Sequence, residues 1–187
     1  MSEGPVEPTR EVSWWWSDEG RPFAWYGVLA MIGVVGGMLW RSIVILPTFE
    51  VRPGLRAVPT SEGTMTAWFA ADSWFSIMGI VTGLVIGVLA WRWFNHRGWI
   101  VTVHAVVGAL LVALVVWQVG EALGPGPFAD RLAAAQVGDI LPIGFELRSY
   151  PAFLLWAFAA ITPVMLAAAF SPDTDEEPAE SETTMTA

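Results

Sequence analysis

The chain has 187 residues, a length typical of one domain, with 55% apolar and only 14% charged residues, whereas about a quarter of a soluble domain is charged. The net charge of −9 argues against a nucleic-acid partner, because binding of phosphates requires clustered Lys and Arg. The absence of cysteine excludes disulfides, thiolate metal sites and cysteine nucleophiles.

The first 22 residues form a predicted cytoplasmic tail that carries Trp14-Trp15-Trp16 shortly before the first apolar stretch. Tryptophan prefers the lipid headgroup layer, where its ring is partly buried and its N–H stays hydrated. We therefore interpret the triplet as an interfacial anchor, with a stacking site for a ligand as the alternative. The tail is acidic rather than basic and the stretch after it is long, so this stretch is expected to remain as a membrane span.

Four apolar stretches, each near the ~20 residues that cross a bilayer core, predict an all-α membrane protein. Each stretch is apolar on nearly all sides, which excludes a soluble helix with one polar face. We expect an antiparallel four-helix transmembrane bundle whose spans are residues 23–46, 67–93, 99–120 and 150–170.

Two longer connections are expected to form a small extracytoplasmic cap at one end of the bundle. In residues 47–66, an alternation of apolar and polar residues is broken by Pro53-Gly54, which predicts a short β-hairpin. In residues 121–148, we expect a short helical turn at 130–136 and an extended piece at 139–147. The extended pieces of the two connections are predicted to pair.

The distribution of arginine predicts the orientation in the plasma (inner) membrane. Arg92 and Arg97 flank the short turn between the second and third spans, with no acidic residue nearby, so the positive-inside rule places this turn in the cytoplasm. An even number of spans then places both termini there too. The tail at residues 171–187 contains six acidic residues and no basic one, which predicts a disordered end, with a docking tail as the alternative.

Small residues at four-residue spacing predict how the helices pack. Gly79, Gly83 and Gly87 follow this spacing in the second span, Gly33 and Gly37 in the first, and three alanines in the third. In lipid, helix association depends on the close backbone approach that small residues permit. We expect one compact bundle around the glycine face of the second span. The alternative leaves one glycine face for a membrane-protein partner or a homo-oligomer.

Three ionisable residues inside the spans are candidates for function, because burying such groups costs free energy unless they are paired. Arg41 and Asp72 lie at similar depth near the outer boundary, and we predict a salt bridge that fixes helix register, with a proton or ion pathway as the alternative. His104 lies near the inner boundary and is expected to bond a backbone carbonyl, Thr82 or Thr102. A lone His without nearby Cys or carboxylates is a poor metal site.

Several segments resemble one known family. These are residues 33–40 of the first span, residues 69–75 at the start of the second, and Trp91-Arg92-Trp93 with His96-Arg97-Gly98 at the inner turn. With the glycines of the third span and the proline of the fourth, they resemble a family of small four-helix membrane proteins of unknown function found in actinobacteria. The resemblance covers about residues 25–171. It implies the four-helix fold and brings no activity, ligand or cofactor.

The sequence contains no phosphate-binding glycine loop, nucleophile elbow, haem or zinc constellation, or repeat between its halves, so we expect neither an enzyme nor a cofactor. The favoured hypothesis is a non-enzymatic accessory or scaffold subunit of a cell-envelope membrane complex. The alternative is a small proton-coupled carrier or ligand-binding membrane protein that uses Arg41, Asp72 and His104.

Overall fold

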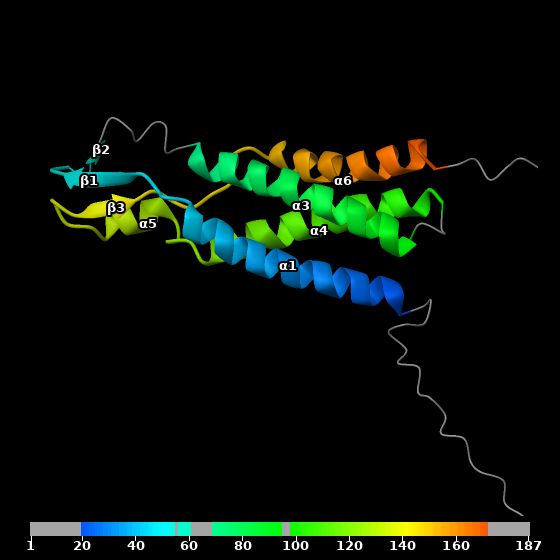
Figure 1. Cartoon of the computed structure of the whole chain (residues 1–187). Helices are drawn as coiled ribbons and strands as arrows, with labels where there is room; N and C mark the ends of the chain where they lie inside the picture. Colours follow the sequence, from blue (N-terminus) through cyan, green and yellow to red (C-terminus); the bar gives the residue numbers. More distant parts are fainter. Residues whose placement is uncertain (1–19, 55, 61–68, 95–97, 172–187) are drawn as a thin grey trace, which may run out of the picture.

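The structure is a computed structural model that describes residues 20–54, 56–60, 69–94 and 98–171. The four longest helices of the described residues are α1 (Arg21–Ile43), α3 (Ala70–Phe94), α4 (Ile100–Ala122) and α6 (Ala152–Ala169). Successive helices run antiparallel, so that α1 and α4 run in one direction and α3 and α6 in the other, and α1 begins and α6 ends at the same end of the bundle (Figure 1). The fold class predicted from the sequence is confirmed, and the helices begin and end within three residues of the predicted spans. The tryptophan triplet, His96, Arg97 and the acidic tail lie outside the described residues.

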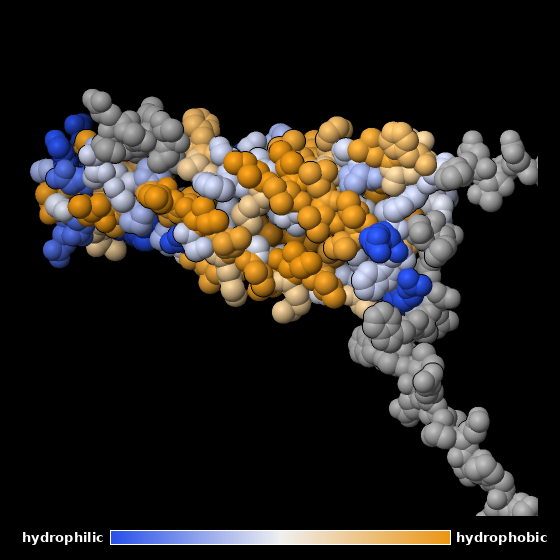
Figure 2. Space-filling model, in the orientation of Figure 1, coloured by the Kyte–Doolittle hydropathy of each residue, from blue (hydrophilic) through white to orange (hydrophobic). Residues whose placement is uncertain are grey.

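The outer surface of the helices is apolar on every side of the bundle. Large apolar side chains are exposed on each helix, as at Val35 of α1, Val81 of α3, Leu114 of α4 and Phe158 of α6. Figure 2 shows hydrophobic side chains over the flank of the helices and hydrophilic ones at the end that carries the β-sheet. So much exposed apolar surface along helices of this length is stable only in lipid, so the chain is a multi-pass membrane protein in contact with the bilayer.

The glycine face of α3 packs against α6 of the same chain. A Cβ built on Gly79 would meet the Trp156 indole, one on Gly83 would lie 2.6 Å from the Trp156 carbonyl oxygen, and one on Gly87 would lie 2.5 Å from Cγ of Pro163. All three glycines are buried. The predicted role of this face in packing the bundle is confirmed. The alternative, that this face is left over for a partner or homo-oligomer, is wrong because α6 already covers it.

The other small-residue faces also lie inside the bundle. α1 packs mainly on α4. A Cβ on Gly33 would lie 2.7 Å from Cβ of Val115, and one on Gly37 would lie 2.7 Å from Cβ of Val119. α4 also contacts α3 and α6, whereas α1 and α3 touch only lightly. The alanines of α4 that follow the four-residue spacing are all buried, namely Ala105, Ala109 and Ala113. The bundle is therefore two tight helix pairs, α1 with α4 and α3 with α6, joined through α4.

The two longer connections meet at one end of the bundle (Figure 1). Strands β1 (Thr48–Arg52), β2 (Arg56–Pro59) and β3 (Ile140–Pro142) form an antiparallel sheet in the order β2-β1-β3, beside the short helix α5 (Phe128–Ala133). Gly54 in the turn between β1 and β2 has φ of +81°, a conformation that glycine adopts without steric cost. The predicted hairpin and its pairing with the second connection are confirmed.

We expect Gly83→Ala to destabilise the bundle, because the new methyl group would lie 2.6 Å from a backbone oxygen and 2.8 Å from Cβ of Ala159. Overpacking of this kind costs about 1–3 kcal/mol. Gly27→Ala is the matched control, because a Cβ at Gly27 has no atom within 4 Å. Thermal unfolding in mild detergent should show a lower midpoint for Gly83→Ala alone. Equal midpoints for both variants would contradict the packing of α3 on α6.

Candidate functional site

The three predicted ionisable residues lie at opposite ends of the bundle. Arg41 is in the last turn of α1 and Asp72 in the first turn of α3, both at the end that carries the sheet. His104 is near the start of α4 and contacts Tyr26, near the start of α1. At a rise of ~1.5 Å per residue, Tyr26 and Arg41 are ~22 Å apart along α1. The structure therefore does not bring His104 together with Arg41 and Asp72.

Asp72 binds the backbone of the segment that precedes α6. Its Oδ1 accepts a hydrogen bond from the Arg148 N–H at 3.0 Å, and Ser76 Oγ donates to its backbone oxygen at 2.8 Å. Within the described residues, no salt bridge joins Asp72 to Arg41. The predicted Arg41–Asp72 salt bridge is therefore wrong. The prediction failed because the segment between β3 and α6 contacts both side chains. The position of this segment cannot be inferred from the depths of Arg41 and Asp72 along their helices.

Residues 145–148, which we call the mouth segment, close the sheet end of the bundle. Phe145 and Leu147 are 4% and 5% exposed, and the Phe145 ring packs edge-on against Trp40 at 4.4 Å between centroids. The Leu147 N–H donates to Glu121 Oε1 at 3.3 Å. Carboxylates from α3 and α4 thus accept hydrogen bonds from two successive backbone N–H groups. The mouth segment is fixed by apolar burial and by both acids.

Arg41 contacts the mouth segment through its guanidinium group. Its Cζ lies 5.5 Å from the centroid of the Phe145 ring, within the range of a cation–π interaction. Its Nε is buried and has no hydrogen-bond partner among the described residues. Arg41 and Asp72 therefore share a neighbourhood, as their depth predicted, and each stabilises the mouth segment separately.

His104 holds α4 against α1 and α3. Its Nδ1 is 2.8 Å from the Tyr26 hydroxyl in a hydrogen bond, and its ring stacks on Phe94 at 4.3 Å and 17°. The predicted partners Thr82 and Thr102 make no described bond to it. Sequence reasoning missed Tyr26, although its position near the inner end of the first span matches the depth of His104.

Several tryptophans lie in the core of the bundle. Trp25 and Trp40 are 2% and 0% exposed, so they face the bundle and not the lipid. Trp40 and Trp156 each pack on Phe75 at 5.2 Å between centroids. Trp74 and Trp99, by contrast, are exposed.

Among the described residues, no three His, Asp or Glu side chains come together in a group that could hold a metal ion. Comparison of the chain with known protein families, curated proteins and solved structures found no match. The family resemblance proposed from the sequence stays a prediction.

Replacing the acceptor at Asp72 should loosen the mouth segment. Asp72→Ala leaves the Arg148 N–H without its partner and should lower the free energy of unfolding in detergent by about 1–2 kcal/mol, while Asp72→Asn keeps an amide oxygen and should lose less. In a double-mutant cycle with Arg41→Gln, we expect a coupling below about 0.5 kcal/mol. A coupling energy well above about 1 kcal/mol would contradict this account and indicate a direct salt bridge between Arg41 and Asp72.

The contact between Tyr26 and His104 can be tested with a nearly isosteric change. Tyr26→Phe removes only the hydroxyl that bonds Nδ1 and should lower the free energy of unfolding by about 0.5–1.5 kcal/mol. Tyr150→Phe removes the hydroxyl of the other tyrosine, which is 66% exposed, and is the matched control. If Tyr26→Phe has no effect in a His104→Ala background while it destabilises the parent chain, the hydrogen bond is the cause. An unchanged parent chain would contradict it.

Proposed function

We propose that the chain is a non-enzymatic accessory or scaffold subunit of a membrane complex in the cell envelope. One observation carries this proposal: each candidate functional side chain is used to hold the bundle together. Asp72 and Arg41 stabilise the mouth segment, and His104 joins three helices. These structural roles favour a rigid component of a complex over a protein whose ionisable groups bind or transport a ligand.

The geometry weighs against the carrier hypothesis. A proton-coupled carrier requires ionisable groups along a shared path, yet His104 is ~22 Å along the bundle from Arg41 and Asp72. A half-enclosed cavity of about 200 Å³ does lie at mid-bundle. Its lining is Ile32, Val35, Gly36, Leu39, Met78, Thr82, Val112, Val116 and Trp156, which includes no ionisable side chain.

The sheet end offers a contact surface for a partner protein. Val137 and Ile140 are 65% and 64% exposed beside β3, an outer strand of the sheet. Apolar side chains exposed together outside the helices favour a protein contact. The small-residue faces of the helices are covered by other helices of the same chain, whereas the sheet end is exposed. A partner can therefore bind at the sheet end without a rearrangement of the bundle.

The orientation in the membrane is part of the same proposal. Arg21 and Arg92 lie at the end where α1 begins and α3 ends, and the positive-inside rule favours a cytoplasmic location for that end. The sheet end then faces the extracytoplasmic side of the plasma membrane. Both ends of the described chain lie at the Arg21 end of the bundle (Figure 1), so the same proposal places both on the cytoplasmic side.

Isolation of the tagged chain in lipid nanodiscs from its native membrane tests the proposal. We expect one membrane protein to co-purify in a fixed ratio, and the double change Val137→Ser with Ile140→Ser to reduce its yield at least fivefold. Ala129→Ser with Ala134→Ser, also exposed near the sheet, is the matched control and should keep the yield. Recovery of the chain alone and monomeric would refute the subunit proposal. Equal yields of the co-purified protein from both double variants would refute the proposed contact at Val137 and Ile140.

A further inference from the structure

Two arginines and a tryptophan line a pocket at the end of the bundle opposite the sheet. The pocket has a volume of about 380 Å³ and is lined by Arg21 of α1 and by Leu89, Arg92 and Trp93 of α3. Arg21 Nη2 donates a hydrogen bond to the Trp93 carbonyl oxygen at 3.0 Å, which fixes its guanidinium group at the pocket. The described lining carries two positive charges and no carboxylate. Its charge therefore suits an anion.

The depth of this pocket matches the lipid headgroup layer. Arg21 is the first residue of α1 and Arg92 lies in the last turn of α3, so both lie where the spans leave the hydrocarbon core. Arg92 is exposed and makes no hydrogen bond or ion pair with another described residue. Guanidinium groups bind phosphate through paired N–H donors, and tryptophan favours this layer. The anion that a membrane offers at this depth is a lipid phosphate.

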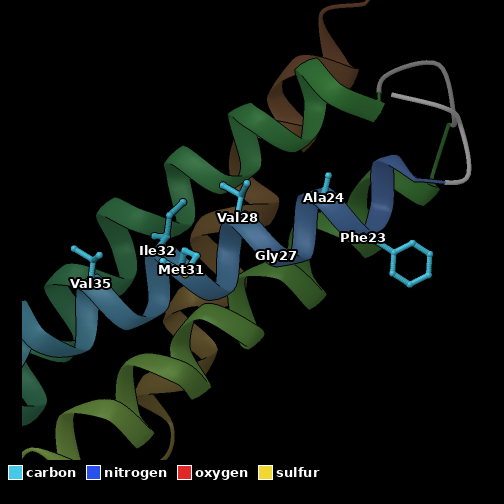
Figure 3. Close-up of a pocket in the computed structure, with 7 residues that line it drawn as sticks. All are labelled: Phe23, Ala24, Gly27, Val28, Met31, Ile32 and Val35. Atoms are coloured by element: carbon cyan, nitrogen blue, oxygen red, sulfur yellow. The ribbon is translucent and has the colours of Figure 1, made fainter. Parts of the chain in front are cut away.

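An apolar groove runs from this end along α1. It has a volume of about 620 Å³ and is lined by Phe23, Ala24, Gly27, Val28, Met31, Ile32 and Val35. Figure 3 shows Ala24, Val28, Ile32 and Val35 in a row along one side of α1. From Phe23 to Val35 the groove extends ~18 Å, slightly more than half of the ~30 Å hydrocarbon core. This length suits the acyl chain of one leaflet.

The groove continues into the bundle. Ile32 and Val35 also line the cavity of about 200 Å³ at mid-bundle, whose other walls come from α3, α4 and Trp156 of α6. The cavity exists because α1 and α3 touch only lightly. The apolar groove therefore extends from Phe23, two residues after Arg21, to the cavity at the middle of the bundle.

We propose that this surface binds one anionic phospholipid from the leaflet at the Arg21 end. The lipid phosphate contacts Arg21 and Arg92, and one acyl chain lies along α1 with its end at the mid-bundle cavity. The lipid fills the space between α1 and α3 and joins the α1–α4 pair to the α3–α6 pair. Charge, depth and groove length all favour this occupant over an uncharged lipid or a second copy of the chain.

Native mass spectrometry of the full chain, delipidated in mild detergent and then titrated with lipid, tests the proposal. We expect one molecule of phosphatidylglycerol to bind at least tenfold more tightly than phosphatidylcholine. Arg92→Gln should reduce phosphatidylglycerol affinity at least fivefold, since it removes one of two phosphate contacts. Arg52→Gln, which makes the same charge change in the sheet, is the control and should leave the affinity unchanged.

Gly27→Phe gives a second, independent readout. A side chain at this position meets no atom within 4 Å at its Cβ, so the fold tolerates it, but the ring occupies the groove. It should weaken binding of both lipids equally, while Arg92→Gln should weaken phosphatidylglycerol more than phosphatidylcholine, because the choline cation offsets the charge of the phosphate in phosphatidylcholine. Inorganic phosphate at millimolar concentration should not displace the lipid.

The proposal is overturned if the two lipids bind equally, if Arg92→Gln has no effect, or if free phosphate competes. It is also overturned if the chain runs as a dimer that Gly27→Phe dissociates, because a second copy would then occupy the groove. Failure of these tests leaves the subunit proposal intact, since that proposal rests on the contacts of Asp72, Arg41 and His104 and not on this pocket.

Discussion

The structure depends on close backbone contact between α3 and α6. Water does not drive helices together inside a bilayer, so association relies on van der Waals packing at small residues. Gly79, Gly83 and Gly87 form a flat strip, and Trp156 and Pro163 fill it. Because α6 is held on α3 in this way, the chain just before α6 is brought to the end of the bundle. The mouth segment, and with it the contacts of Asp72 and Arg41, follows from this packing.

The polar residues that contact the mouth segment have structural roles that follow from the packing of α6 on α3. Asp72 and Glu121 accept hydrogen bonds from backbone N–H groups of the mouth segment, which is a structural use of carboxylates. Phe145 contacts both Trp40 and the Arg41 guanidinium at that end. At the other end, His104 bonds Tyr26 and stacks on Phe94. This use of polar groups supports a scaffold whose working surfaces are its exterior.

The sequence predicts those parts of the fold that depend on local chemistry. Hydropathy locates the spans, glycine spacing identifies the packing face of α3, and Pro53-Gly54 marks the hairpin. The partner of Asp72 was beyond prediction, because it is a backbone group on a connection whose path depends on the complete bundle. Buried Trp40 and exposed Trp74 are alike in depth along their helices, and only the neighbouring helices decide which one turns inward.

Cysteine cross-linking measures the central α3–α6 contact most directly, because the natural chain contains no cysteine. A Cβ at Gly83 would lie 2.8 Å from Cβ of Ala159, so a shift of about 1 Å brings Gly83→Cys and Ala159→Cys into disulfide range. In membranes, mild oxidation should give a rapid cross-link within one chain, while Val28→Cys with Ala159→Cys should give none. A cross-link that forms only between two chains would place the glycine face at an intermolecular interface and contradict the account.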